Sequence, residues 1–173
     1  AADTYKAIER IRAHGAMDSH ATGSSNNIVE RSATGANTID ISLHLMFGLP
    51  GETDAEIIET AQIINELKPT MVKLHNLHVL KNTPLEDLYR QGKFSPLELE
   101  EYARRVVLFL KHLSPDVAVQ RLAAVTSRWN ELVAPDWTRF KLRSYQYIID
   151  RIKVPESFLC LQRTKNSIGT FTT

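Results

Sequence analysis

Apolar and polar residues alternate along residues 39–47, and the alternation ends in a Gly-Leu-Pro-Gly-Glu turn. Every second position is apolar: Ile41, Leu43, Leu45 and Phe47. The intervening positions are Asp40, Ser42, His44 and Met46. Because successive strand residues point to opposite faces, the pattern predicts a strand with one face under helices and the other lining a polar cavity. Glycines let backbone approach a ligand closely, so a site is expected at the C-terminal mouth of an α/β sheet or barrel.

A second strand is predicted over residues 71–80 by the same kind of alternation. Its apolar and polar rows are Val72 with Leu74, and Lys73 with His75. A shorter strand is expected over residues 117–122. If the first two strands are neighbours, His44 and His75 lie close together on the polar side of the sheet.

Three Ser/Thr-x-x-Glu motifs predict helix starts, because the hydroxyl and the carboxylate satisfy free amides of the first turn. These motifs begin at Thr53, Thr83 and Ser95. The predicted helices span residues 3–14, 53–67, 83–92, 95–113 and 138–152. Strands that alternate with helices imply an α/β fold with parallel strands and right-handed crossovers. Three strands are too few to close a barrel, so we expect a section of a barrel or a small open sheet.

Composition is that of a globular protein with one core-forming domain. The chain has 173 residues, 43% of them hydrophobic, and no apolar run approaches the roughly 20 residues of a membrane span. It lacks an initiator Met and a signal peptide, so we expect a piece of a longer, cytoplasmic protein. A single cysteine, Cys160, excludes an internal disulfide or a multi-cysteine metal site in this chain, and is expected to be an inert thiol.

Charge is unevenly distributed. Residues 1–119 carry a net charge of −4 and residues 120–173 one of +5. The basic stretch holds Arg139, Lys141, Arg143, Arg151 and Lys153, interleaved with Trp137, Phe140, Tyr145 and Tyr147. This stretch is either a solvated helix face, which the modest excess favours, or a surface for RNA.

Three further sets of residues are candidates for binding or catalysis. Asp40, His44 and His75 suit a metal-dependent lyase or hydrolase, although the lack of a third strong ligand at a fixed spacing favours two hydrogen-bonded cavity histidines. His75 and His78 are a poor chelating pair on one strand, unless the strand has ended near Asn76. Arg121 follows a short strand and suits either a carboxylate or phosphate ligand or a structural ion pair.

The ordered segments HLMFGLPGET (44–53), VKLHNLHVLKNTPLEDLYRQGKF (72–94), LELEEYARRVVLFLKHLSP (97–115) and QRLAAVTSRWNELVAPDW (120–137) resemble the C-terminal part of a YhcC-like radical SAM protein. That family is related to the oxygen-independent coproporphyrinogen oxidases. The resemblance implies the C-terminal section of a partial (β/α)6 TIM-like barrel, whose fifth and sixth strands are residues 40–47 and 71–80. It divides the chain into four parts. Residues 1–15 are a helix before the fifth strand, and residues 16–38 are a flexible loop or foreign insert. Residues 39–153 are the barrel section with its following helices, and residues 154–173 are an irregular tail.

The resemblance also implies a cofactor. Strands five and six of such enzymes help to hold S-adenosylmethionine, which a [4Fe-4S] cluster cleaves to a 5′-deoxyadenosyl radical. By position, the implied cofactor-binding residues are His44, Met46, Gly48, Leu49, His75, Leu77 and His78. The implied substrate is RNA, such as a wobble uridine of tRNA.

The chain departs from this family by lacking its CxxxCxxC-like cluster motif and the first four strands. We therefore expect it to be inactive alone and to self-associate through exposed sheet edges. A non-catalytic RNA-binding module is a further alternative.

Overall fold

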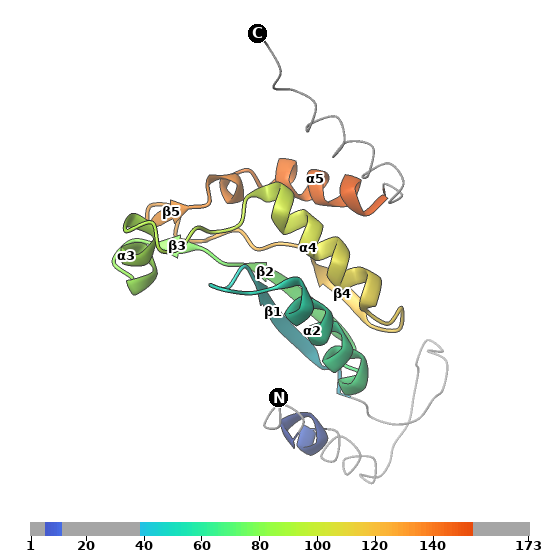
Figure 1. The fold of residues 1–173 in the computed structure, drawn as a ribbon. Coiled ribbons are helices and arrows are strands. Elements are labelled where there is room, and N and C mark those ends of the chain that lie inside the picture. Colours follow the sequence, from blue (N-terminus) through green and yellow to red (C-terminus); the bar gives the residue numbers. More distant parts are fainter. Residues whose placement is uncertain (1–5, 12–38, 154–173) are drawn as a thin grey trace, which may run out of the picture.

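A computed structural model describes residues 6–11 and 39–153. Its centre is a parallel sheet of three strands in the order β1 (Ser42–Phe47), β2 (Met71–Asn76) and β4 (Ala118–Arg121) (Figure 1). The register joins Ser42 to Met71 and Phe47 to Asn76. The predicted parallel α/β architecture is therefore confirmed. Among the described strands, β1 and β4 are the outer ones, and self-association through them stays a prediction.

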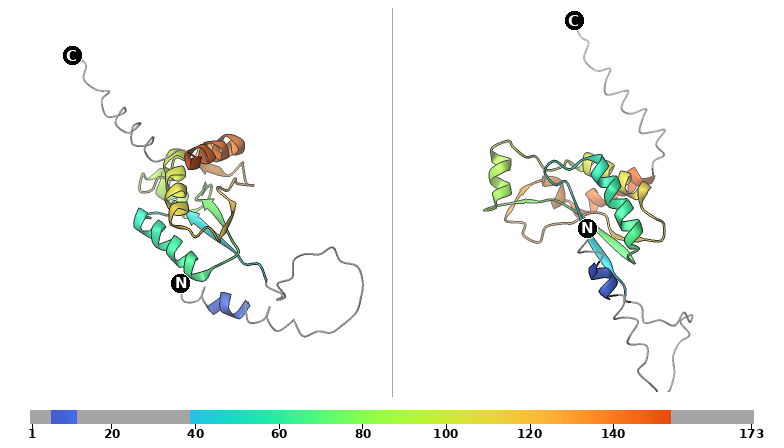
Figure 2. Two further views of the ribbon diagram at one scale, coloured as in Figure 1. Left: turned by 90° about the vertical axis from the view of Figure 1, so that its right-hand side faces the viewer. Right: turned by 60° about the horizontal axis from the view of Figure 1, so that its bottom comes forward.

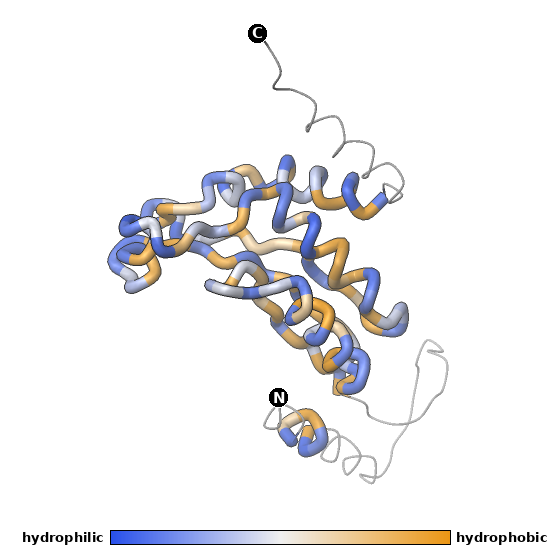
Figure 3. Tube along the Cα trace, in the orientation of Figure 1, coloured by the Kyte–Doolittle hydropathy of each residue, from blue (hydrophilic) through white to orange (hydrophobic). Residues whose placement is uncertain are grey.

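Two helices, α2 (Asp54–Leu67) and α4 (Leu99–His112), contact each other and pack on the apolar face of this sheet (Figures 1 and 2). The centre of the core consists of Phe47, Ile57, Ala61, Val72, Leu74, Tyr102, Val106 and Phe109. In Figure 3 the hydrophobic stretches follow the strands and the helices over them. Helix 6–11 adds the buried side chain of Ile8 to this core. None of the described helices is long and apolar enough to cross a membrane.

The helix start predicted at Thr53 is confirmed at the beginning of α2. The Thr53 hydroxyl accepts from the Glu56 amide, and the Glu56 carboxylate accepts from the Thr53 amide at 2.7 Å, which lowers the Glu56 pKa. At α3 (Pro84–Arg90), Thr83 caps as expected, but the Glu86 carboxylate accepts from the amide of Asn82 instead.

The third helix start was predicted wrongly. Helix α4 begins at Leu99, with Glu98 as an N-cap that makes no side-chain capping bond. The Leu97 carbonyl accepts from Trp137 Nε1 at 2.9 Å, and the Leu97 side chain covers Gly48. These tertiary contacts involve residues just before α4, where the motif alone predicted its first turn.

The second strand was also predicted to be too long. It ends at Asn76, and β3 (Val79–Leu80) follows as a separate strand. This short strand pairs antiparallel with β5 (Leu132–Ala134), which the sequence analysis missed. Pairing with β5 draws the chain away from the parallel sheet after Asn76.

The C-terminal part consists of a 3-10 helix, η2 (Asp136–Arg139), and α5 (Lys141–Lys153). Trp137 stacks near Tyr102 at 5.3 Å between ring centroids, and Tyr145 donates its hydroxyl proton to the Ala123 carbonyl. Arg151 pairs with Glu100 of α4 and lies over the Tyr147 ring. Several aromatic residues of the basic stretch therefore attach α5 to the core. The predictions for residues 16–38, Cys160 and the tail lie outside the described residues.

The Gly-Leu-Pro-Gly-Glu turn is fixed by its own glutamate. The Glu52 carboxylate accepts from the Gly48 amide at 2.6 Å and from Arg105 of α4 at 3.1 Å. Both the Glu52 and the Arg105 side chains are largely buried, with 11% and 13% exposed. The turn that follows β1 is therefore held against α4 by a shielded ion pair.

Replacing Gly48 by Ala should destabilise the chain more than replacing Gly51. Both glycines have positive φ, +91° and +81°, so each alanine costs about 1–2 kcal/mol of backbone strain. Only at Gly48 would the new Cβ meet a neighbour, Leu97 Cγ at 3.1 Å. Urea denaturation should show a free energy of unfolding lower for G48A than for G51A by roughly 1 kcal/mol. Equal losses would contradict the close packing of Leu97.

Candidate functional site

The sheet face turned away from α2 and α4 carries His44 and Met46 from β1, Lys73 and His75 from β2, and Arg121 from β4. We call these five residues the polar face. The strand register places Met46 beside His75, His44 beside Lys73, and Lys73 beside Arg121. His44 is exposed and Met46 is 46% exposed, in contrast to the buried apolar row of the same strands. The predicted division between an apolar and a polar row is confirmed.

The two predicted histidines do come together. The rings of His44 and His75 stack with centroids 5.0 Å apart and planes 23° from parallel. Burial and the positive charges of Arg121, His44 and Lys73 lower the pKa of His75. Its Nε2 atom is buried without a hydrogen-bond partner among the described residues, as is the hydroxyl oxygen of Ser42.

The structure does not bring Asp40, His44 and His75 together as a metal site, so the metal hypothesis gains no support. Among residues 6–11 and 39–153, no three His, Cys, Asp or Glu side chains form a group that could hold a metal ion. Asp40 precedes His44 by four strand positions, which separates them by about 13 Å along the strand. Stacked imidazole rings also do not converge their nitrogens on one point.

Asn76 is the polar residue that the sequence analysis missed. It follows Val72 and Leu74 at the strand period and is therefore buried, with 3% exposed. Its Oδ1 accepts from the Ala124 amide at 2.9 Å, and its Nδ2 lies 3.2 Å from His78 Nε2. An amide at the third position of an apolar row was the available signal, because a buried side-chain amide needs hydrogen-bond partners.

This arrangement fixes the state of His78. Because the Ala124 N–H can only donate, Asn76 must present its oxygen there and its NH2 group to His78. His78 Nε2 must then be an unprotonated acceptor, so the ring is neutral. Burial and the nearby His75 lower the pKa of His78, which agrees with a neutral ring.

Of the other residues predicted to bind the cofactor, Gly48 and Leu77 make contacts within the fold, whereas Leu49 is exposed. Gly48 is buried, with its amide bound to Glu52, and Leu77 donates its amide to the Phe47 carbonyl. Leu49, at the tip of the turn, is 47% exposed. Leu49, Met46 and His44 therefore present apolar and aromatic surface at the C-terminal end of β1.

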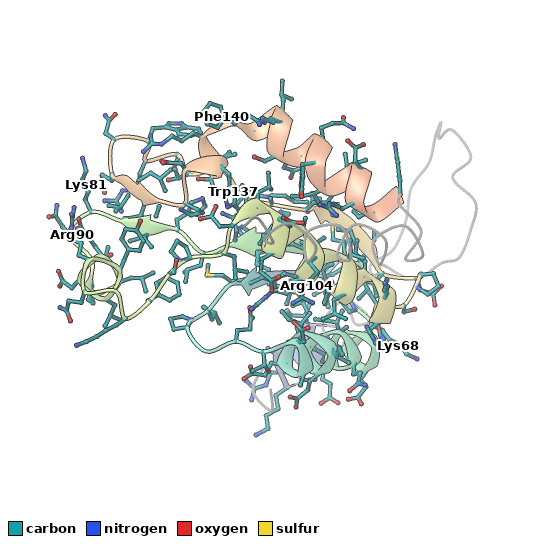
Figure 4. The ribbon with its side chains drawn as sticks, turned by 45° about the horizontal axis from the view of Figure 1, so that its top comes forward. Lys68, Lys81, Arg90, Arg104, Trp137 and Phe140 are labelled. Carbon is teal, nitrogen blue, oxygen red and sulfur yellow. The ribbon has the colours of Figure 1, made fainter. Side chains whose placement is uncertain are left out.

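Only part of the basic stretch is exposed and available to a partner. Arg139 and Arg151 hold carboxylates or carbonyls, whereas Phe140, Lys141, Leu142 and Arg143 form an exposed run. Figure 4 shows Phe140 on the outer side of the molecule and Trp137 nearer the strands.

Residues 69–154 match the family described as the radical SAM C-terminal domain. Over this range the chain is similar to radical SAM proteins, and it resembles the C-terminal part of the YhcC proteins. Its similarity to the protein MJ0486 of Methanocaldococcus jannaschii is 36% identity over 115 residues, which covers 66% of this chain and 36% of that protein. YhcC of Escherichia coli K12 is 32% identical over 99 residues, covering 57% of this chain and 32% of YhcC.

A third relative is more distant. The tRNA uridine(34) acetyltransferase of Methanocaldococcus infernus is 31% identical over 80 residues, covering 44% of this chain and 15% of that enzyme. The radical SAM chain described here thus spans about a third of the length of MJ0486 and YhcC. Its relation to coproporphyrinogen oxidases stays a prediction.

The two histidines with lowered pKa should make this radical SAM section less stable in mild acid. For His75 and His78 the pKa in the folded chain lies below the ordinary value of 6.5, so the unfolded chain binds more protons as the pH falls. Their contribution to the free energy of unfolding is complete above about pH 6.5 and is lost below it, by at most about 1.4 kcal/mol per pH unit for each histidine. Urea denaturation between pH 7.5 and 5 measures this loss.

The matched variant is H78Q, whose side-chain oxygen can accept from Asn76 at any pH in this range. Its stability should fall less steeply with acid than that of the wild type. An unchanged slope would contradict the neutral His78.

Proposed function

We propose that the polar face and the tip of the turn, through His44, Met46, Leu49 and His75, hold part of S-adenosylmethionine in a radical SAM protein that acts on RNA. The main support is that exposed apolar side chains lie close to a polar atom without a hydrogen-bond partner, at one end of the parallel sheet. Met46 and Leu49 offer apolar contact, while His75 Nε2 lacks a partner among the described residues. Ligand sites in α/β folds lie at the carboxyl ends of the strands, where these residues are.

Each residue has a distinct role in this proposal. The stacked His44 and His75 rings provide a flat surface on which a heteroaromatic base can lie. Met46 adds a polarizable side chain beside them, at register with His75. Gly48 and Leu77 act indirectly, through packing at the end of β1, and His78 acts through Asn76.

The iron–sulfur cluster does not fit this chain. A [4Fe-4S] cluster takes several cysteine thiolates, and the sequence holds only Cys160. In the proposal the cluster is ligated by parts of the full-length protein that this chain does not contain. When bound beside such a cluster, S-adenosylmethionine supplies radical chemistry; the residues described here bind and orient it.

RNA is the proposed substrate class on two grounds. One relative is named as a tRNA uridine(34) acetyltransferase. The exposed run of Phe140, Lys141, Leu142 and Arg143 alternates apolar side chains with two cations. Backbone phosphates attract such cations, and bases stack on exposed aromatic rings.

S-adenosylmethionine binding is tested by calorimetric titration of the chain. Wild type should bind weakly, and H44A should bind roughly fivefold to tenfold more weakly, because one face of the stacked pair is lost. The control is H112A, which removes an exposed histidine at the end of α4. Equal affinity for wild type and H44A would refute the proposed site.

RNA binding is tested separately with the double variant K141Q/R143Q. Its tRNA affinity should fall, and the slope of log affinity against log salt should decrease by about two, one for each lost phosphate contact. K93Q, at an exposed position after α3, is the matched control. Affinity that is absent in wild type, or independent of salt, would contradict the RNA proposal.

A further inference from the structure

Two fixed cations are adjacent on the polar face. Lys73 of β2 is the register partner of Arg121 of β4, after a β-bulge between Val72 and Lys73. Neighbouring strands lie about 4.8 Å apart, and register partners point to the same side of a sheet. Their two long side chains can therefore converge on a single group in front of the sheet.

Neither cation is neutralised within the described residues. Lys73 and Arg121 form no ion pair or side-chain hydrogen bond there, unlike Arg104 and Arg105, which bind the carboxylates of Asp54, Glu101 and Glu52. Both are only partly exposed, so solvent screens their charges incompletely.

Among the described residues of the polar face, the neighbours of these two cations are histidines and not carboxylates. His44 is the register partner of Lys73, and His75 follows Lys73 two positions later on the same face of β2. Burial lowers the pKa of His75, and the charges of Arg121, His44 and Lys73 lower it further. Asp40, the acidic residue on the same strand face, is about 13 Å from His44 along the strand.

Such a cluster repels itself in the chain alone and is relieved by an anion. We propose that Lys73 and Arg121, with His75 beside them, bind a phosphate group of the substrate on the polar face. The phosphate dianion matches the two fixed charges, and its three oxygens can accept from the guanidinium, the ammonium and the imidazole together.

The phosphate site deepens the function proposed above and rests on it in assigning the phosphate to the substrate. It lies toward β4, whereas the residues proposed for S-adenosylmethionine lie toward β1 and the turn. His75 is the residue common to both. The two sites can therefore be tested independently through residues that belong to only one of them.

The test titrates the full 173-residue chain with inorganic phosphate and follows the histidine ring signals by NMR. Phosphate should bind in a saturable manner and raise the measured pKa of His75, since it offsets the positive charges around that ring. K73Q and R121Q should each weaken phosphate binding about tenfold. K73R, which keeps the charge, should retain most of the affinity, and K93Q should match wild type.

Parallel titrations identify the source of the anion. A nucleoside monophosphate should bind at least as tightly as inorganic phosphate, and acetate more weakly, with K73Q reducing all three. Acetate that binds as tightly as phosphate would overturn the assignment in favour of a carboxylate site. Phosphate binding that K73Q and R121Q leave unchanged would overturn the site itself.

The outcome is distinguishable from failure of the proposed cofactor site. H44A should weaken S-adenosylmethionine and leave phosphate within about twofold, whereas K73Q should do the reverse. Circular dichroism of each variant shows whether it is folded. If R121Q does not fold, K73Q against K73R decides the question alone: equal loss in both would overturn the proposal.

Discussion

The ends of the central strands depend on the hydrogen bonds of Asn76. This buried amide closes β2, accepts from the Ala124 amide after β4, and is bound in turn by a neutral His78. Two segments that are 48 residues apart are thereby held at one edge of the sheet. A buried amide that lost either partner would leave an unpaired polar group in the core, which is costly. His75 lies on the polar face, whereas His78, after the end of β2, lies beside the Asn76 side chain.

The other strand end is fixed by a charge. Glu52 binds the Gly48 amide and Arg105 of α4, so the turn after β1 is attached to a helix that covers the opposite face. The Gly48 amide therefore already has its partner within the turn, and the exposed surface here comes from Met46 and Leu49. The polar groups available to a ligand are therefore those of the polar face, on the other side of the sheet, and most of them are basic.

How far the sequence predicts this structure follows from the range of the interactions. Alternation located β1 and the start of β2 and separated their two faces, because the period of two and one buried face together fix the pattern. The Thr53 cap was predictable because all of its partners lie within four residues. The helix start predicted at Ser95 was wrong because Leu97 contacts Gly48 and accepts a hydrogen bond from Trp137. Both partners are distant in sequence, so no local motif reveals them. β3 and β5 pair only two or three residues over a long separation, which leaves no periodic signal. His44 and His75 were predictable as neighbours, but the stacking of their rings was not, because it depends on side-chain rotamers.

The central claim is that the polar face and the tip of the turn, on the side away from α2 and α4, hold S-adenosylmethionine. Intermolecular nuclear Overhauser effects between S-adenosylmethionine and the labelled chain test this most directly. The account predicts contacts from the adenosyl protons to the Met46 methyl group and to the ring protons of His44 and His75. Contacts confined to α2, α4 or α5, with none to these three side chains, would contradict it.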